Sequence, residues 1–411
     1  MSRVPTEFLY WEKLRSPKVR RLRSAFTKIM GWDLFPPDEV VHKFADGFYD
    51  ADPVAEAFVD EVYLGRGAAE GRALLDRAIE HGVDSIPDAP ESMRTLFAEF
   101  ETPPEWLDMD RVRAGARTWC RYGPVAFALG GVTTLEMYSE NSLAKPLALS
   151  GGYAGDSARH RFLETSRFWI DVSEPGGLEP GGAGRKAAMR VRIMHVFIRR
   201  RLLQHPEWDL AAWGVPISMS DATTTLMGGS VSPGLVLWTH GFQTTIKEIE
   251  DLQHFWKYIG YLMGVQPDWY PEDVRSGVQL LAATLLRRAH RSGQDGRDLI
   301  ESYPVAFRPR PGTGWKRRLY DEIHYRVQLG YTGFWLPPWT YRRYDLPNPF
   351  PWLLIPVLSW PFVFVAETIR RFVPGADRLA YRQARRFREF WYRQEMGTEQ
   401  ARFAPAETFR R

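Results

Sequence analysis

The amino-acid sequence predicts an all-α fold, and three observations support this prediction. Apolar residues recur at three- and four-residue steps over long segments, for example in 188–202, and this spacing places them on one face of a helix. Strand patterns, in which apolar and polar residues alternate, are sparse. Prolines and glycines separate the helical segments, as at Pro87, Pro90, Pro103 and Pro104.

The composition narrows the possible functions. The formal net charge is only +4 and the basic residues form no recognisable module, so nucleic acid is not an expected partner. A single cysteine, Cys120, excludes an intrachain disulfide and a thiolate metal cluster. Because the N-terminus has no apolar signal segment, we expect an intracellular protein, either cytoplasmic or at a membrane surface. Aromatic residues make up 14% of the chain, which is enough to line an apolar cavity.

Three regions are expected along the 411 residues: a basic N-terminal arm in 1–40, a helical domain in 41–336 and an apolar, proline-rich extension in 337–411. Residues 9–32 of the arm hold seven basic residues and one acidic residue, interleaved with apolar ones. Such an arm is either a solvated helix packed on the domain or a helix that lies on an anionic membrane. Asp52-Pro53 predicts a helix start.

Residues 107–149 predict two or three helices that are rich in glycine and alanine. The small residues indicate close helix packing, with room for a cofactor as the alternative. Glu136 and Glu140 lie one helical turn apart and are interpreted as a solvated face rather than as a catalytic base or a metal-ligand pair. The glycine-rich stretch 174–184 lacks the spacing of a phosphate loop, so we expect a mobile connector that could gate access to a site.

A histidine surrounded by arginines marks the segment 161–203. His195 lies in the apolar stripe of the second helix of this segment, so it points inward. Five arginines flank the stripe: Arg190, Arg192, Arg199, Arg200 and Arg201. An inward imidazole with cations at the rim suits a flat, buried, dianionic cofactor. On the first helix, Arg161 and Thr165 share the inward face, with Glu164 beside them.

This pattern resembles the haem-dependent oxygenases that include rubber oxygenase (latex-clearing protein) and the MpaB oxygenase of mycophenolic acid biosynthesis. The resemblance rests on Arg161, Glu164 and Thr165, which precede His195 by 34, 31 and 30 residues, and on the R-x-x-H that ends at His195. Three further segments match in order. PPEWLDMDRVRAGARTWCRYGP and MYSENSLAKPLALSGGYAGD lie upstream, and IKEIEDLQHFWKYIGYLMGVQPDWYP lies downstream. The resemblance covers roughly residues 45–300.

The resemblance implies a globin-like haem pocket between the two helices. It implies that His195 is the proximal ligand of haem b, with Arg192 and Arg199 also at the cofactor, and that Arg161, Glu164 and Thr165 form the catalytic distal side. The rubber-cleaving branch carries a lysine where this chain has Glu164. The implied reaction is O2-dependent oxidation or cleavage of a carbon–carbon double bond in an apolar, isoprenoid or lipid-like substrate.

Two other interpretations remain open beside an oxygenase. One is a noncatalytic haem protein that senses or carries a gas or haem itself, and the other is a helical membrane-peripheral protein without haem. A nonhaem iron site with His195, His240 and a glutamate has little support, because the H-x-E of His205 and Glu207 lies past the helix end.

The C-terminal extension contains an uncharged run, 349–366, that includes four prolines and lies between arginine pairs. Three structures are compatible with such a run: a hairpin at a membrane surface or channel lining, a buried packing element, and a membrane-spanning helix. Peripheral membrane association is therefore an expected property, through this run and the basic arm together.

Overall fold

The protein consists of helices and connecting loops in the computed structural model, which describes residues 3–150, 157–310 and 312–396. No strand occurs in these ranges, so the predicted all-α class is confirmed. The first half of the chain forms α1 (Tyr10–Leu14), α2 (Pro17–Met30), α3 (Asp38–Asp46), α4 (Pro53–Phe58), the π-helix η1 (Val59–Leu64), α5 (Ala68–His81), η2 (Val83–Ser85), α6 (Glu91–Glu101), α7 (Met109–Arg121), α8 (Pro124–Met137), α9 (Asn141–Leu149), α10 (Ser157–Ser173) and α11 (Ala183–Leu202). The second half forms α12 (Leu210–Trp213), α13 (Met219–Gly229), α14 (Val231–Val236), η3 (Leu237–His240), α15 (Ile246–Leu262), α16 (Val274–Arg287), α17 (Gly293–Val305), α18 (Trp315–Trp335), α19 (Pro338–Arg343), α20 (Leu354–Phe372) and α21 (Ala376–Met396).

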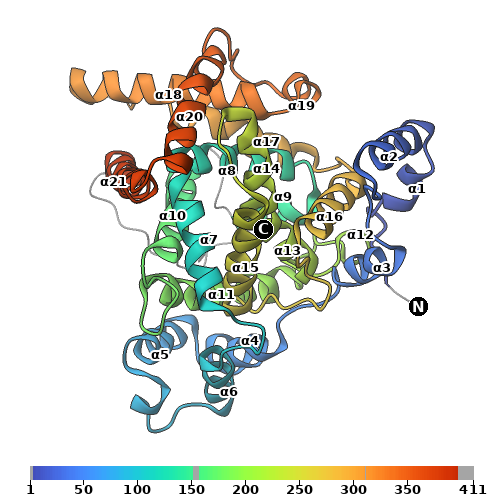
Figure 1. Cartoon of the computed structure of the whole chain (residues 1–411). Coiled ribbons are helices and arrows are strands. Elements are labelled where there is room, and N and C mark those ends of the chain that lie inside the picture. The colour runs from blue at the N-terminus through green and yellow to red at the C-terminus, as the bar shows by residue number, and fades with distance from the viewer. Residues whose placement is uncertain (1–2, 151–156, 311, 397–411) are drawn as a thin grey trace.

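Helices α7 and α15 form the central pair of the molecule (Figure 1). A capping box fixes the start of α15, where Thr245 and Glu248 each accept a hydrogen bond from the other's backbone N–H. Gly115 of α7 lets the two backbones meet, because a Cβ there would lie 2.2 Å from the carbonyl oxygen of Asp251. In the same way, Gly130 and Gly131 of α8 pack against aromatic rings, which confirms close helix packing for the small residues at these positions.

Helices α10 and α11 form an antiparallel pair that carries the predicted site residues. The pair is closest near its loop, where a Cβ on Gly184 would lie 2.5 Å from the Cα of Val172. The loop itself is tied to two other helices, since Glu174 pairs with Arg388 of α21 and Glu179 pairs with Arg113 of α7. The predicted connector is therefore present, and these ion pairs hold it against α7 and α21.

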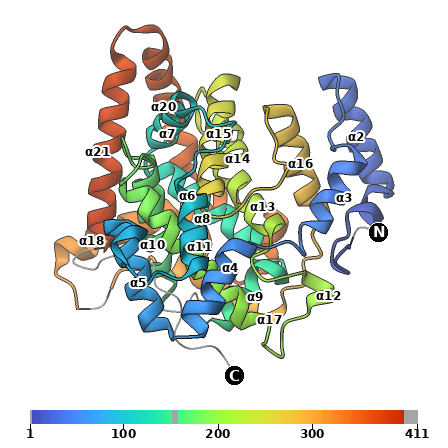
Figure 2. The same cartoon turned by 90° about the horizontal axis from the view of Figure 1, so that it is seen from below.

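The two terminal segments lie on opposite sides of the molecule (Figures 1 and 2). On one side, Phe8 and Tyr10 pack with Phe44 and Phe48 in an aromatic cluster, whereas α2 has no buried residue. On the other side, α18, α20 and α21 pack against one another. Among the described helices, none combines the length and the apolar character that crossing a membrane would require.

Candidate active site

The predicted site residues of α10 and α11 lie toward the same end of the helix pair. His195 follows Gly184 by eleven residues, which corresponds to about 16 Å along α11. Glu164 precedes Val172 by eight residues, or about 12 Å along α10 in the opposite chain direction. Because the helices run antiparallel and meet at Gly184 and Val172, both positions are displaced from the loop in the same direction. The fold therefore brings the two predicted halves of the site to one end of the pair.

His195 has the properties of a histidine that can ligate iron. Burial, together with the nearby guanidinium of Arg199, lowers the pKa of its imidazole to about 4, so the ring is neutral at physiological pH. No hydrogen bond joins either ring nitrogen to any residue in the described part of the chain. A neutral imidazole with an uncommitted nitrogen lone pair is the form that binds a metal.

Accessible surface remains next to His195 inside the helical bundle. His195 and Ile198 are only half-buried, although most of the neighbouring positions of α11 are buried. A pocket of about 20 Å³ adjoins His195 and also touches Ala222 of α13. Along α13, Ala222 begins a stripe of incompletely buried small residues that continues to Thr225 and Gly228, each three residues further on.

This accessible stripe is compatible with a flat cofactor beside His195. The pocket at His195 has room for about one water. Gly228 could carry a Cβ without a clash, because its nearest neighbour would be a methyl group of Thr133 at 3.6 Å. The small side chains of α13 keep this face free of bulky groups and the donor chemistry at His195 suits haem iron, although the pocket itself is much smaller than a haem.

Glu164 is the most buried member of the predicted distal group, with 8% of its surface exposed. Its carboxylate lies 3.5 Å from Arg161 Nη1 and 3.5 Å from His160 Nε2. The hydroxyl of Thr165 donates a hydrogen bond to the carbonyl oxygen of Arg161 at 3.1 Å. The structure thus groups the three predicted residues on one helix. Their catalytic roles stay predictions.

Arg192 and Arg199 also adjoin the pocket, but their guanidinium groups are taken up by protein partners. Arg192 binds both carboxylate oxygens of Asp52, at 2.7 and 2.9 Å, and Glu99 at 2.6 Å. Arg199 binds Glu56 at 3.3 Å and two backbone carbonyls of the turn before α13. Carboxylates therefore neutralise the expected ring of cations at these two positions. They come from α4, from α6 and, for Asp52, from the loop before α4. A direct role of Arg192 and Arg199 at the cofactor stays a prediction.

Sequence reasoning did not identify the residues that hold these arginines. Asp52 was expected only as a helix start, and it does cap α4, since its Oδ1 accepts a hydrogen bond from the N–H of Ala55 at 3.1 Å. Asp52 also binds Arg192, and this second role requires glycine at position 264. A Cβ added there would lie 2.1 Å from the Asp52 carboxylate. Ile217 adopts a φ of 53°, a strained conformation for a β-branched residue, and its carbonyl oxygen accepts from Arg199 at 2.7 Å. The A-x-x-T-x-x-G spacing of α13 was a detectable signal for the accessible stripe.

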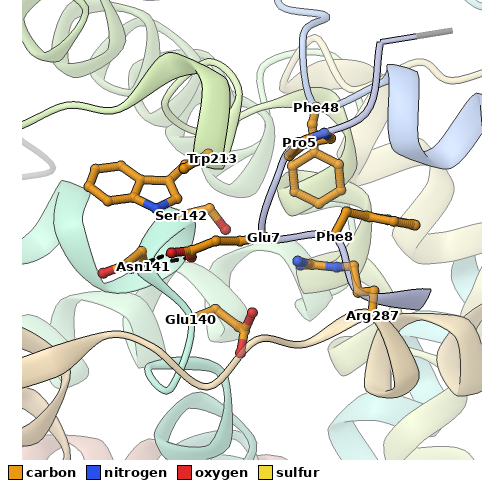
Figure 3. Close-up of a pocket in the computed structure, with 10 residues that line it drawn as sticks. Pro5, Glu7, Phe8, Phe48, Glu140, Asn141, Ser142, Trp213 and Arg287 are labelled. Atoms are coloured by element: carbon orange, nitrogen blue, oxygen red, sulfur yellow. Dashed lines mark hydrogen bonds between the residues drawn. The ribbon is translucent and has the colours of Figure 1, made fainter. Parts of the chain in front are cut away.

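A second polar cluster surrounds Glu140 and corrects one expectation (Figure 3). Glu140 is 3% exposed and accepts backbone hydrogen bonds from Ala289 and His290, at 2.9 and 2.8 Å. Glu136 pairs with Arg288 at 3.3 Å. The interpretation of Glu136 and Glu140 as a solvated face was wrong, because the segment after α16 covers both carboxylates. They anchor that segment.

The described residues contain no cluster of three or more metal-binding side chains, so no nonhaem metal site is found among them. His240 instead packs against α18, where its Nε2 lies 3.1 Å from the hydroxyl of Tyr331. Burial lowers the pKa of His240 to about 4, which keeps this ring neutral as well.

Comparison with known proteins covers the segment of the chain that contains α10 and α11. Residues 117–371 match the family described as "ER-bound oxygenase mpaB/B'/Rubber oxygenase, catalytic domain". The rubber oxygenase of Streptomyces sp. (strain K30) is 25% identical over 230 residues, which is 54% of this chain and 54% of that protein, so the chain spans about half the length of this relative. The latex clearing protein LCP in its closed state has a similar fold, with a TM-score of 0.60, 19% identity and coverage of 84% of this chain and 91% of that one. Since the family match extends over more than half of the sequence, the chain belongs to the family of mpaB and rubber oxygenase catalytic domains.

Proposed function

We propose that this protein is a haem b-dependent oxygenase that uses O2 to oxidise or cleave a carbon–carbon double bond in an apolar, isoprenoid or lipid-like substrate. The observation that carries the proposal is the neutral imidazole of His195, which has no hydrogen-bond partner in the described chain and lies beside the accessible stripe of α13. Family membership supports the same class of reaction.

In this proposal, His195 holds the haem iron. When bound there, haem would supply the redox chemistry that activates O2. Burial by α11 and its neighbours keeps His195 deprotonated, so no proton competes for the ligating nitrogen. Arg192 and Arg199 act as positioning residues, because one binds α11 to Asp52 and the other binds it to the turn before α13.

The residues of α10 would handle protons and charge at the reacting double bond. Arg161 lies 3.5 Å from Glu164, so its guanidinium orients this carboxylate and stabilises negative charge nearby. Glu164 would accept a proton from an allylic C–H of the substrate. Thr165 would donate a hydrogen bond to an oxygen atom only after its hydroxyl rotates away from the Arg161 carbonyl.

The apolar substrate class is carried over from the relative, whose name states an action on rubber. The aromatic content of the sequence is compatible with such a substrate, whereas Phe168 of α10 is buried and packs in the core. A lysine occupies the Glu164 position in the rubber-cleaving branch, so we infer that this chain handles its substrate with a carboxylate in place of an amine.

The decisive experiment is the visible absorption spectrum of the purified protein, reconstituted with hemin, together with its pyridine haemochromogen. A Soret band and a haem b haemochromogen are expected, and failure to take up hemin would refute the proposal. Oxygen consumption then separates an oxygenase from a haem carrier. An unsaturated oligoisoprenoid should stimulate O2 uptake, whereas its fully saturated analogue should not.

A further inference from the structure

Helix α20 exposes an apolar stripe to the outside of the molecule. Six large apolar residues follow one another at steps of three or four, so they share one face, and each is between 40% and 77% exposed: Leu354, Leu358, Phe362, Val365, Ile369 and Phe372. We call these six residues the α20 stripe. Phe350, which is 62% exposed, extends the same spacing before the helix begins. A continuous exposed apolar face of this kind marks an interaction surface.

In the C-terminal half of α20, the opposite face carries two charged residues that bind the body of the protein. Glu367 accepts a hydrogen bond from Arg121 of α7 at 3.2 Å and another from the backbone N–H of Gln243 at 3.2 Å. Arg370 pairs with Glu248 of α15 at 3.3 Å. Both side chains are buried. An ordinary surface helix buries its apolar face and exposes its polar one, whereas this half of α20 does the reverse. These contacts prevent the α20 stripe from rotating inward.

The charges near the α20 stripe are positive. Residues 337–396 hold ten arginines against five carboxylates, and no charged residue lies in 346–366. Three exposed arginines share one face of the neighbouring helix α21: Arg378, Arg382 and Arg386. None of the three forms an ion pair with a residue in the described ranges. Glu367 and Asp377, by contrast, are already paired with arginines.

We infer that the α20 stripe docks onto the surface of an anionic lipid bilayer. Apolar side chains would enter the acyl boundary while the arginines of α21 remain at the level of the headgroups, which is the arrangement of interfacial helices. A second copy of the chain is a poorer partner, because a two-fold interface would bring the arginine-rich segment close to its own copy. The inference does not depend on haem binding.

The test is flotation of the full-length protein with two kinds of vesicle, phosphatidylcholine alone and phosphatidylcholine mixed with phosphatidylglycerol. The protein should float with the anionic vesicles at low salt and less completely at high salt, because screening weakens only the electrostatic part. Phe362→Asp and Phe372→Asp should each lower the vesicle partition constant about tenfold or more, since each removes a large apolar side chain from the bilayer.

Two variants make the test specific. Ile29→Asp removes an equally exposed apolar residue of α2, in the basic arm. The arm lies on the other side of the molecule, so the arm and the α20 stripe would not meet one bilayer together as the sequence suggested, and this variant should float like the wild type. Replacing Arg378, Arg382 and Arg386 by Gln should reduce binding to the anionic vesicles and leave binding to neutral vesicles unchanged. Because all these side chains are exposed, the circular dichroism spectrum should not change.

Two results would overturn the inference. In the first, the wild-type protein stays at the bottom of the gradient with anionic vesicles at low salt. In the second, Phe362→Asp leaves flotation intact but converts a dimer into a monomer in light scattering, which would assign the α20 stripe to a second copy of the chain.

Discussion

Replacing Asp52 by Asn should measurably destabilise the protein through the ion pair behind His195. Arg192 is 1% exposed and the Asp52 side chain 7% exposed, so the pair is shielded from water. Removing one partner of a buried pair costs about 3–5 kcal/mol. We expect the lower end, about 3 kcal/mol, because Glu99 still binds Arg192 at 2.6 Å and Asn still caps α4. Unfolding gains about 2.1 cal/mol/K per residue, so over 411 residues this loss lowers the melting temperature by about 3–4 °C.

Thermal unfolding followed by circular dichroism measures this shift, and Asp76→Asn is the matched control. Asp76 of α5 pairs at 2.9 Å with Arg190, which lies on α11 as Arg192 does. The Asp76 side chain is 46% exposed, so its loss should change the melting temperature by less than about 1 °C. Asp52→Asn should also bind haem more weakly, since Arg192 lies one turn before His195. If Asp52→Asn melted as the wild type does and kept its haem, the buried pair would not hold α11 in place.

Three further predictions concern the site. His195→Ala should lose the Soret band and keep its helical circular dichroism, whereas the exposed control His81→Ala should keep both. A ferric protein reconstituted with hemin should show a high-spin electron paramagnetic resonance signal, and Glu164→Lys should convert part of it to low-spin because an amine can then bind the iron. Burial lowers the pKa of His195 and of His240 to about 4, below about 6.5 in an unfolded chain, so the unfolded state takes up these protons first. The contribution of the two neutral histidines to the stability of the haem-free protein is therefore complete above about pH 6.5 and is lost as the pH falls toward about 4. When melting temperatures are measured over this pH range, His240→Phe should lose less stability than the wild type.

The sequence was sufficient to predict the helices and the inward direction of His195, because both depend on local spacing. Ala188 and Leu202, which share the predicted stripe, are fully buried. Residues 107–149, for which two or three helices were expected, form the three helices α7, α8 and α9, and the helix start at Asp52-Pro53 is also found. In each case residues close together in the chain determine the structure.

The partners of the charged residues could not be predicted, because they come from distant parts of the chain. Asp52 lies 140 residues before Arg192, and Glu99 lies 93 residues before it. Glu140 was interpreted as part of a solvated face because it lies one helical turn from Glu136, whereas the backbone that covers it lies about 150 residues later. The sequence of one helix shows how many cationic side chains it carries. It does not show which of them will pair with a carboxylate from a distant part of the chain.

The C-terminal run poses a different problem, since composition alone does not reveal which face of a helix meets the protein. An uncharged stretch with four prolines was compatible with burial, with a bilayer surface and with a membrane span. The orientation of α20 is set by Glu367 and Arg370, which lie after the uncharged run and bind α7 and α15. Two charged residues at the end of the helix therefore determine that the apolar stripe faces outward.

Charged residues also fix the position of His195. Tight apolar packing around a ligand histidine would fill the space that a cofactor needs, and here His195 and Ile198 remain half-buried. Arg192 and Arg199 lie one turn before and one turn after His195, and they bind α11 to two separate segments, at Asp52 and at Ile217. These ion pairs and hydrogen bonds hold the helix from both sides without occupying the stripe of α13. The strained φ of Ile217 is then a cost of fixing α11 relative to α13, so releasing it by Arg199→Met should loosen haem binding more than it lowers helix content.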